Sequence, residues 1–233
     1  PTKKWEDWRF TNLSSISKGN FRISEIQDAP KGDLDISPYK LKDIDTIVIY
    51  NGHYQETLSS IPSGVQLLSG LDYLEKTNSE FNSPEHSPFD LLNTAFMDSG
   101  MSIVVDSNVD VEKPIRMLFI SSGLESLMVT PRIHIDLGES SSVTFIEHHV
   151  GNSTSFFQNE SVFVILGQNA QLNHIRIQSN SVSTANMAKI QVEQNADSRY
   201  TFFQFADGSR LGRLNIHAEL KGEGADCSLN GLA

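Results

Sequence analysis

Two stretches, Ile133-His-Ile-Asp-Leu-Gly-Glu-Ser-Ser141 and Val162-Phe-Val-Ile-Leu-Gly-Gln-Asn-Ala170, share one pattern, an apolar strand that runs into a short turn. The pattern returns at 189–196 and 216–225, with a period of 26 to 29 residues, and a second strand such as Val143-Thr-Phe145 follows each turn. Strand repeats of fixed period indicate a solenoid or a propeller, but a propeller blade needs about four strands in ~40–45 residues. We therefore expect a parallel β-helix, with an antiparallel sandwich of hairpins as the alternative.

Stacked coils should place residues of the same phase directly over one another, about 4.8 Å apart. The large apolar residue before each turn should then form one interior column, which comprises Leu137, Leu166, Val192 and Leu220. The small residue that ends each turn should stack in the same way, which applies to Ser141, Ala170, Ala196 and Ala225. The fourth copy fits this register only with one extra turn residue.

The first hundred residues have a different character. Thr46–Tyr50, the pair Asn51-Gly52 and residues 53–58 predict a β-hairpin, because Asn-Gly accepts the positive φ angles of a type I′ turn. Ser87-Pro88 before an apolar stretch from Phe89 to Met97, with Gly100 after it, predicts a short helix. We expect residues 1–100 to form a small α+β region and residues 101–233 to form the first half of a β-helix core.

The composition excludes several classes of protein. The chain has 233 residues, a net charge of −11, 38% apolar residues and one cysteine. No apolar run approaches the roughly 20 residues that span a bilayer, and the acidic balance argues against nucleic acid or anionic lipid as the main partner. A single cysteine excludes an internal disulfide and favours a reducing compartment such as the cytoplasm.

Several motifs resemble the SufB/SufD family of the SUF iron–sulfur cluster assembly machinery. The opening Lys4-Trp-Glu-Asp-Trp-Arg-Phe-Thr-Asn-Leu13 resembles the SufD side of the family. The passages that resemble the family's core are Leu91–Phe96 followed by Gly100–Val105 and Pro114-Ile115, then Val143–His149 and Leu229–Leu232. The resemblance covers essentially all 233 residues.

The resemblance implies a scaffold rather than an enzyme. Such chains form a right-handed parallel β-helix, pair with a SufB subunit, and are held by the ATPase SufC, with an iron–sulfur cluster forming transiently at the level of the complex. Nothing here matches the family's later coils, so its cluster-interface Cys and His are not assigned. We expect no catalytic, cofactor-binding or metal residues in this chain, and a location in the cytoplasm or, in a plastid-bearing organism, the plastid stroma.

The start without Met and the end at Ala233, within an apolar pattern, suggest an N-terminal fragment. A β-helix that stops within a coil exposes unpaired backbone groups. We therefore expect the coil at 216–233 to self-associate end to end, or to be disordered.

The histidines are candidate metal ligands. His148 and His149 are adjacent, but on a strand they point to opposite faces and cannot share one ion. His134 and His217 occupy the same outward position of different repeats, so we expect both at the surface. His174 falls on an inward position, where a hydrogen-bonded core histidine is expected.

Other candidate residues also have simpler interpretations. Cys227 lies on an inward position beside Leu229, as a small buried residue would. The acidic pairs Glu6-Asp7 and Asp43/Asp45 suggest glycosidase carboxylates, but the repeats offer only the single acids Asp136, Glu193 and Glu219. A carbohydrate-active β-helix enzyme and a non-catalytic binding solenoid stay as alternatives. The sequence has no P-loop, so nucleotide hydrolysis must belong to a partner.

Overall fold

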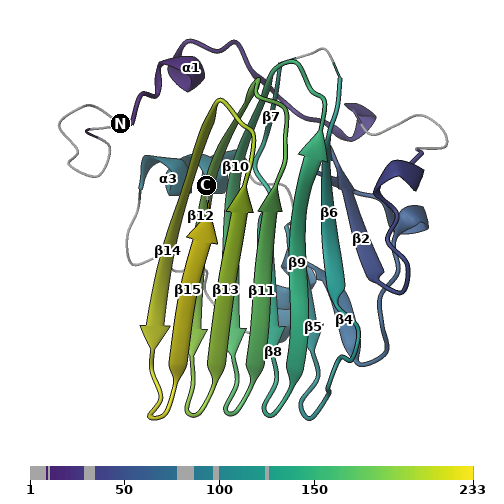
Figure 1. Cartoon of the computed structure of the whole chain (residues 1–233), viewed down its shortest axis with the longest axis vertical. Helices are drawn as coiled ribbons and strands as arrows, with labels where there is room; N and C mark the ends of the chain where they lie inside the picture. Colours follow the sequence, from purple (N-terminus) through teal and green to yellow (C-terminus); the bar gives the residue numbers. More distant parts are fainter. Residues whose placement is uncertain are drawn as a thin grey trace.

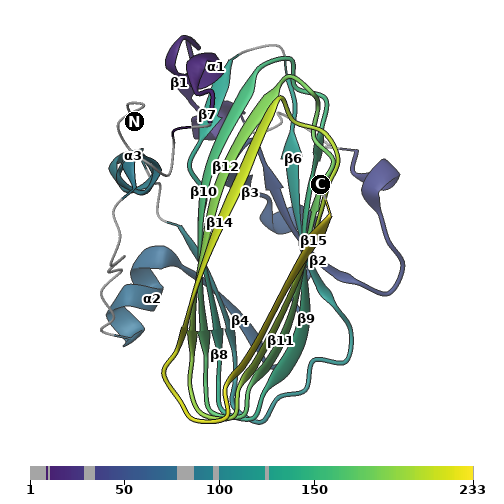
Figure 2. The same ribbon diagram turned by 60° about the vertical axis from the view of Figure 1, so that its left-hand side comes forward.

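The computed structural model describes residues 9, 11–28, 35–77, 87–96, 100–123 and 126–232. Two β-sheets face each other and enclose a flattened interior (Figures 1 and 2). Within each coil the chain passes from one sheet to the other. All pairings between consecutive coils are parallel. The β-helix expected from the repeats is therefore confirmed, and the antiparallel sandwich is excluded.

We call the two sheets sheet A and sheet B. The strands of sheet A are β1 (Arg22–Ile23), β4 (Val65–Ser69), β5 (Met101–Val105), β7 (Leu127–Val129), β8 (Arg132–Leu137), β10 (Phe156–Leu166), β12 (Thr184–Gln194) and β14 (Leu211–Leu220). Those of sheet B are β2 (Asp45–Tyr50), β3 (His53–Tyr54), β6 (Ile115–Ser121), β9 (Ser142–Gly151), β11 (Gln171–Gln178), β13 (Arg199–Ala206) and β15 (Asp226–Leu232).

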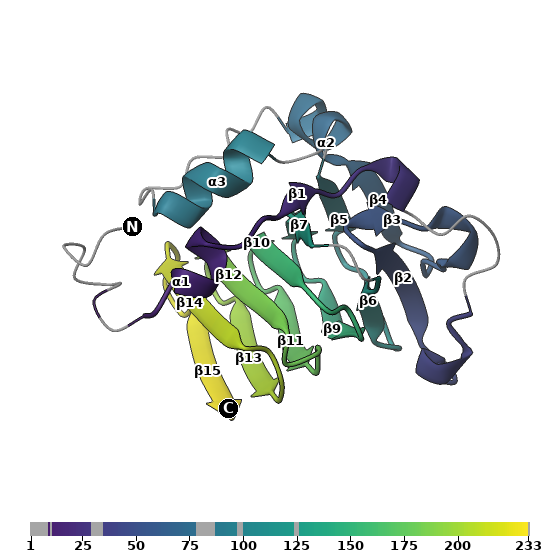
Figure 3. The same ribbon diagram turned by 90° about the horizontal axis from the view of Figure 1, so that it is seen from above.

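In the described part of the chain, three α-helices occur, and they lie along the outer side of sheet A, as the view from above shows (Figure 3). They are α1 (Ser14–Ser17), α2 (Gly70–Thr77) and α3 (Pro88–Phe96), and 3-10 turns occur at η2 (Ile26–Asp28), η3 (Ser37–Tyr39) and η4 (Glu56–Leu58). The predicted helix is confirmed as α3, with Met97 outside the described residues. Its first turn is capped reciprocally, because Asp90 N–H donates to Ser87 Oγ (3.2 Å) and Ser87 N–H donates to the Asp90 carboxylate (3.0 Å).

The recurring turns explain the sequence repeat. In each turn a residue has a left-handed backbone, with φ of 57° at Ser140, 57° at Asn169 and 58° at Asp197. The first residue of a turn lies very close to the backbone of the preceding coil. At Gly222, for example, an added Cβ atom would lie only 2.0 Å from the backbone N of Ala196. Glycine is therefore favoured there, as it is at Gly167.

The register of the third repeat differs from the prediction. Leu166 pairs with Leu137 as expected, but its partner in the next coil is Gln194 rather than Val192. The repeat is displaced by two residues, so the turn ends at Ser198 rather than at Ala196. A polar side chain can occupy this interior column because the Gln194 amide donates to the Asp226 carbonyl (2.9 Å).

The N-terminal region contributes to the same two sheets. β2 pairs in parallel with β6, and β4 pairs antiparallel with β5. The predicted hairpin is confirmed, since Asn51 and Gly52 have φ of 47° and 89° and β2 pairs antiparallel with β3. The second strand of the hairpin is only two residues long before η4 begins.

Candidate functional site in the solenoid interior

Charged side chains occupy part of the solenoid interior. Below them, toward the repeated turns, the interior is apolar and includes Ile135, Leu137, Phe145, Val164 and Leu166. Farther along the same strands the inward positions become polar. The buried residues there are Glu147 and His149 on β9, Gln158 and Glu160 on β10, and His174 and Arg176 on β11.

Arg176 connects the two buried carboxylates. Its Nη1 contacts Glu147 Oε2, and its Nη2 lies 2.7 Å from Glu160 Oε2 on the opposite sheet. Burial alone would raise the pKa of Glu147, but the charge of Arg176, together with that of His174 and with side-chain hydrogen bonds, holds that pKa well below the ordinary value. Burial likewise opposes the charge of Arg176, yet Glu160 and Glu147 raise its pKa above the ordinary value. Glu147 and Arg176 are therefore both ionised.

His174 extends this network toward β13. Its Nε2 lies 3.0 Å from Glu147 Oε1, and its Nδ1 lies 2.9 Å from the hydroxyl of Tyr200. Because a carboxylate only accepts, Nε2 carries the proton and Nδ1 accepts from the tyrosine. Burial, followed by the charge of Glu147, raises the pKa of Tyr200 well above its ordinary value, which keeps the hydroxyl protonated. The prediction of a hydrogen-bonded core histidine is confirmed.

His149 lies between the two carboxylates. Its ring stacks on Phe119 with centroids 4.4 Å apart, and its Nδ1 is 3.2 Å from the amide nitrogen of Gln158. Its Nε2 is 3.5 Å from Glu147 Oε2 and 3.9 Å from Glu160 Oε2, and it makes no hydrogen bond. One possible donor atom from each of these three residues lies within 4.8 Å of the others, so together they could hold a cation.

A cavity of about 230 Å³ adjoins the charged network on the side of the last coil. Arg176 and Gln178 line it on β11 and Gln204 on β13, opposite small residues such as Ala188 and Gly212. The column that carries Glu160 on β10 continues as Ala188 on β12, so the interior widens beside the guanidinium.

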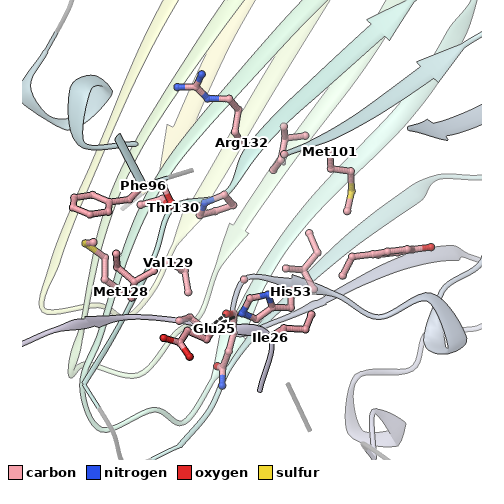
Figure 4. Close-up of a pocket in the computed structure, with 18 residues that line it drawn as sticks. Glu25, Ile26, His53, Phe96, Met101, Met128, Val129, Thr130 and Arg132 are labelled. Carbon is pink, nitrogen blue, oxygen red and sulfur yellow. Dashed lines mark hydrogen bonds between the residues drawn. The ribbon is translucent and has the colours of Figure 1, made fainter. Parts of the chain in front are cut away.

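A second, larger pocket of about 550 Å³ lies where the N-terminal segment meets the solenoid (Figure 4). Its wall is mostly apolar and includes Met101 and Met128. The Arg132 guanidinium points away from it toward α3, where it donates to Asn93 Oδ1 (3.0 Å) and Thr94 Oγ1 (2.7 Å). His53 Nε2 lies 3.1 Å from Ser24 Oγ, which is within reach of a nucleophile–base pair. The Ser24 hydroxyl, however, donates its proton to the Asn51 carbonyl (2.7 Å) and not to the imidazole.

The structure separates the other predicted histidines. His148 is half-buried on the outer face of β9 while His149 is buried inside, so the prediction of opposite faces is confirmed. His217 is exposed as expected. The surface prediction for His134 is wrong, because α2 covers that part of sheet A and His134 stacks between Tyr73 (5.2 Å) and Phe163 (4.9 Å). Burial, followed by the charge of Arg132, lowers the pKa of His134 to about 3.

The predicted thiol and acids lie apart from the charged network. Cys227 is half-buried against the apolar interior, and burial, followed by the nearby Asp226 carboxylate, raises the pKa of its thiol. Asp136 accepts from the Tyr73 hydroxyl (3.2 Å), and Lys221 bridges Glu193 (2.7 Å) and Glu219 (3.6 Å) on the outer surface. Asp43 lies 3.9 Å from Lys113, Asp45 begins β2, and Glu6-Asp7 fall outside the described residues.

The sequence reasoning missed Glu147, Glu160 and Arg176. A usable signal was present, because Glu147 has the same inward phase on β9 as Val143 and Phe145. A charged residue at such a position requires a buried partner. The identity of that partner depends on which strands face each other across the interior. The spacing of the sequence repeats does not specify this.

These features define a parallel β-solenoid with a buried ion-pair network. None of the helices in the described part of the chain is long and apolar enough to cross a membrane. The chain belongs to the SufBD family of SUF system iron–sulfur cluster assembly proteins, and residues 119–233 match the SufBD core domain. That match begins in β6 and includes the complete charged network.

Three curated proteins are similar over most of the chain. An iron–sulfur cluster assembly SufBD family protein of Synechocystis sp. is 26% identical over 93% of this chain and 52% of its own length. The chloroplastic protein ABCI7 of Arabidopsis thaliana is 27% identical over 95% and 50%. The iron–sulfur cluster assembly protein SufD of Escherichia coli is 24% identical over 100% and 55%. The chain thus spans about half the length of these relatives.

Proposed function

We propose that this chain is a non-catalytic scaffold subunit for iron–sulfur cluster assembly, which acts in a complex with a SufB-like subunit and a SufC-like ATPase. The observation that carries the proposal is the match to the SufBD core domain over residues 119–233, which lie within the stacked coils. The motif at Lys4–Leu13 resembles the SufD side of the family. This resemblance supports a role like that of SufD within the proposed complex.

The chemistry of the chain supports a dependence on partners. One cysteine provides a single thiolate, whereas a cluster commonly takes four. The thiol of Cys227 also has a raised pKa, which disfavours the thiolate that would bind iron or accept sulfur. We therefore propose that a cluster is held only transiently, with ligands from the partner subunit. The energy of ATP hydrolysis comes from the ATPase, since this chain has no P-loop.

A reducing compartment suits this proposal. Nascent clusters and free thiols survive where disulfides are kept reduced. We expect the protein to work in the cytoplasm, or in the plastid stroma if its organism has plastids.

Co-purification tests the proposal. The protein that contains this chain is tagged and co-expressed with the SufB-like and SufC-like proteins of its own organism, and the complex is isolated without oxygen. We expect all three to elute in one peak by size-exclusion chromatography with light scattering, and ATPase activity to require the SufC-like protein. The matched control contains the two partners without this chain.

Two results would contradict the proposal. One is elution of the tagged protein apart from both partners at micromolar concentrations. The other is release of reducing sugar from polysaccharides by the purified protein alone, which would support a carbohydrate-active enzyme instead.

A further inference from the structure

We propose that Glu147, His149 and Glu160 form a binding site for one divalent transition-metal ion inside the solenoid, and that Arg176 occupies this site when the metal is absent. The proposal concerns the chain by itself. It goes beyond the scaffold function and does not depend on either partner.

The donor atoms already converge. Glu147 and His149 are two residues apart on β9 and point inward together, while Glu160 approaches from β10 on the opposite sheet. One donor atom from each lies within 4.8 Å of the others, a separation that a central ion could bridge with bonds of about 2.0–2.2 Å after small side-chain movements. All three side chains are at most 1% exposed, so an ion there would be held away from bulk water.

Unpaired atoms indicate that the network is incomplete. His149 Nε2 is fully buried, is directed at both carboxylates and has no hydrogen-bond partner. Glu160 Oε1 is also buried without a partner. A buried polar atom without a partner typically costs about 1–3 kcal/mol. A cation coordinated by both atoms would remove this penalty at two positions at once.

The charges favour a cation over any other ligand. Glu147 and Glu160 are two acidic side chains that share one basic partner, the Arg176 guanidinium. An anion would lie directly against both carboxyl groups in an interior where unpaired charges are costly. A divalent cation, by contrast, can replace the guanidinium as the common partner of the two side chains.

The His149 ring can present a lone pair to the ion. In the present arrangement Gln158 Nε2 lies 3.2 Å from Nδ1, so the amide donates and the ring proton is on Nε2. A rotation of the Gln158 amide by half a turn would place its carbonyl there instead. The carbonyl would accept a proton on Nδ1, and Nε2 would become a metal ligand, the arrangement in which an outer hydrogen bond orients a ligating histidine.

Arg176 has space to leave. The cavity of about 230 Å³ begins at its side chain and is lined by Gln178 and Gln204, whose amide oxygens can accept from a guanidinium. Ala188 and Gly212 leave the opposite wall without a large side chain. The structure thus provides an alternative position for the arginine while the metal takes its place.

The donor set selects the class of metal. One imidazole and two carboxylates suit Mn²⁺, Fe²⁺, Co²⁺ or Zn²⁺. Mg²⁺ and Ca²⁺ prefer sites made only of oxygen ligands, and Cu⁺ prefers thiolates and thioethers. We choose Co²⁺ as the probe, because its visible absorption reports coordination by nitrogen and oxygen.

The first experiment titrates the chelator-treated 233-residue chain with Co²⁺, followed by visible absorption and by calorimetry. We expect one ion per chain. Glu160→Gln and His149→Gln should each weaken binding by at least about tenfold, since even loss of a residue that supports a ligand costs about 10–100-fold. The matched controls are His217→Gln, at an exposed histidine on the last coil, and Cys227→Ser, and both should bind Co²⁺ like the unmodified chain.

The second experiment tests the role of Arg176. Arg176→Gln should bind Co²⁺ more tightly than the unmodified chain, because the competing positive charge is gone, and its melting temperature should rise more on addition of Co²⁺. If this variant does not fold without metal, recovery of its circular dichroism spectrum on refolding with Co²⁺ is the expected result. Failure to recover would overturn the proposed exchange.

Two further results would overturn the proposal as a whole. One is the absence of saturable Co²⁺ binding by the unmodified chain. The other is equal affinity in the unmodified chain, Glu160→Gln and His149→Gln, which would place the ion elsewhere on the surface. In either case the charged network is a structural ion pair only.

Discussion

Arg176 Nη2 lies 2.7 Å from Glu160 Oε2 and so joins the two sheets across the interior of the solenoid. The same guanidinium contacts Glu147, its neighbour on sheet B. Both carboxylates and the arginine are at most 1% exposed. The stability of this part of the interior therefore depends on one cation, because water cannot replace it.

Replacement of Arg176 by methionine should destabilise the metal-free chain by about 3–5 kcal/mol, the usual cost of leaving a buried charge without its partner. The free energy of unfolding in a urea titration measures this loss. Addition of Glu147→Gln and Glu160→Gln should restore part of it, since the unpaired charges are then removed. A loss below about 1 kcal/mol for the single variant would show that water or another group compensates the carboxylates.

The interior column provides a second prediction with an internal control. Leu166 is fully buried, so Leu166→Ala should cost about 2–5 kcal/mol. Leu220 lies two coils farther along the same column, through Gln194, but it is 50% exposed. Leu220→Ala should therefore cost much less in the same denaturant titration. Equal losses at the two positions would contradict the register.

His134 makes stability depend on pH. Its folded-state pKa is about 3 against an ordinary value of 6.5, so between these values the unfolded chain binds a proton that the folded chain does not. The His134 contribution to stability is complete above pH 6.5 and declines as the pH falls toward 3. The slope should approach about 1.4 kcal/mol per pH unit within this window.

A comparison with His134→Phe isolates this effect. Phenylalanine retains the stack with Tyr73 and Phe163 and cannot be protonated. The urea midpoint of this variant should therefore fall less than that of the unmodified chain between pH 6.5 and pH 4. Parallel curves for the two proteins would show that another group is responsible for the pH dependence.

Local patterns predicted much of the fold. The repeated turns gave the stacked coils, Asn51-Gly52 gave the hairpin, and the phase of His174 placed it inside. The third repeat was predicted two residues out of register because Gln194 occupies a column that is apolar in the coils on either side. The shortest hydrogen bond of its amide is to the Asp226 carbonyl of the next coil. Such a contact is long-range and is not encoded in local spacing.

The errors at the site have the same physical origin. His134 has an outward phase, and its burial depends on α2, which the prediction did not place over sheet A. In the charged network, Glu147 and Arg176 lie on the neighbouring strands β9 and β11. Glu160 lies across the interior on β10. Alternation along one strand identifies which residues point inward, but not which of them meet.

The last coil of the chain provides the final prediction. β14 pairs only with β12, and β15 pairs only with β13, so each has one edge without a strand partner in the described part of the chain. Leu229 and Leu232 on β15 are 47% and 61% exposed. An apolar edge strand favours pairing with another chain, so we expect the 233-residue chain to form concentration-dependent dimers by sedimentation velocity. Leu229→Lys with Leu232→Lys should shift it toward monomer, while Val182→Lys, at a residue 74% exposed in a loop, should have no effect. A chain that is monomeric at every concentration would show that this end is stable in water without a partner.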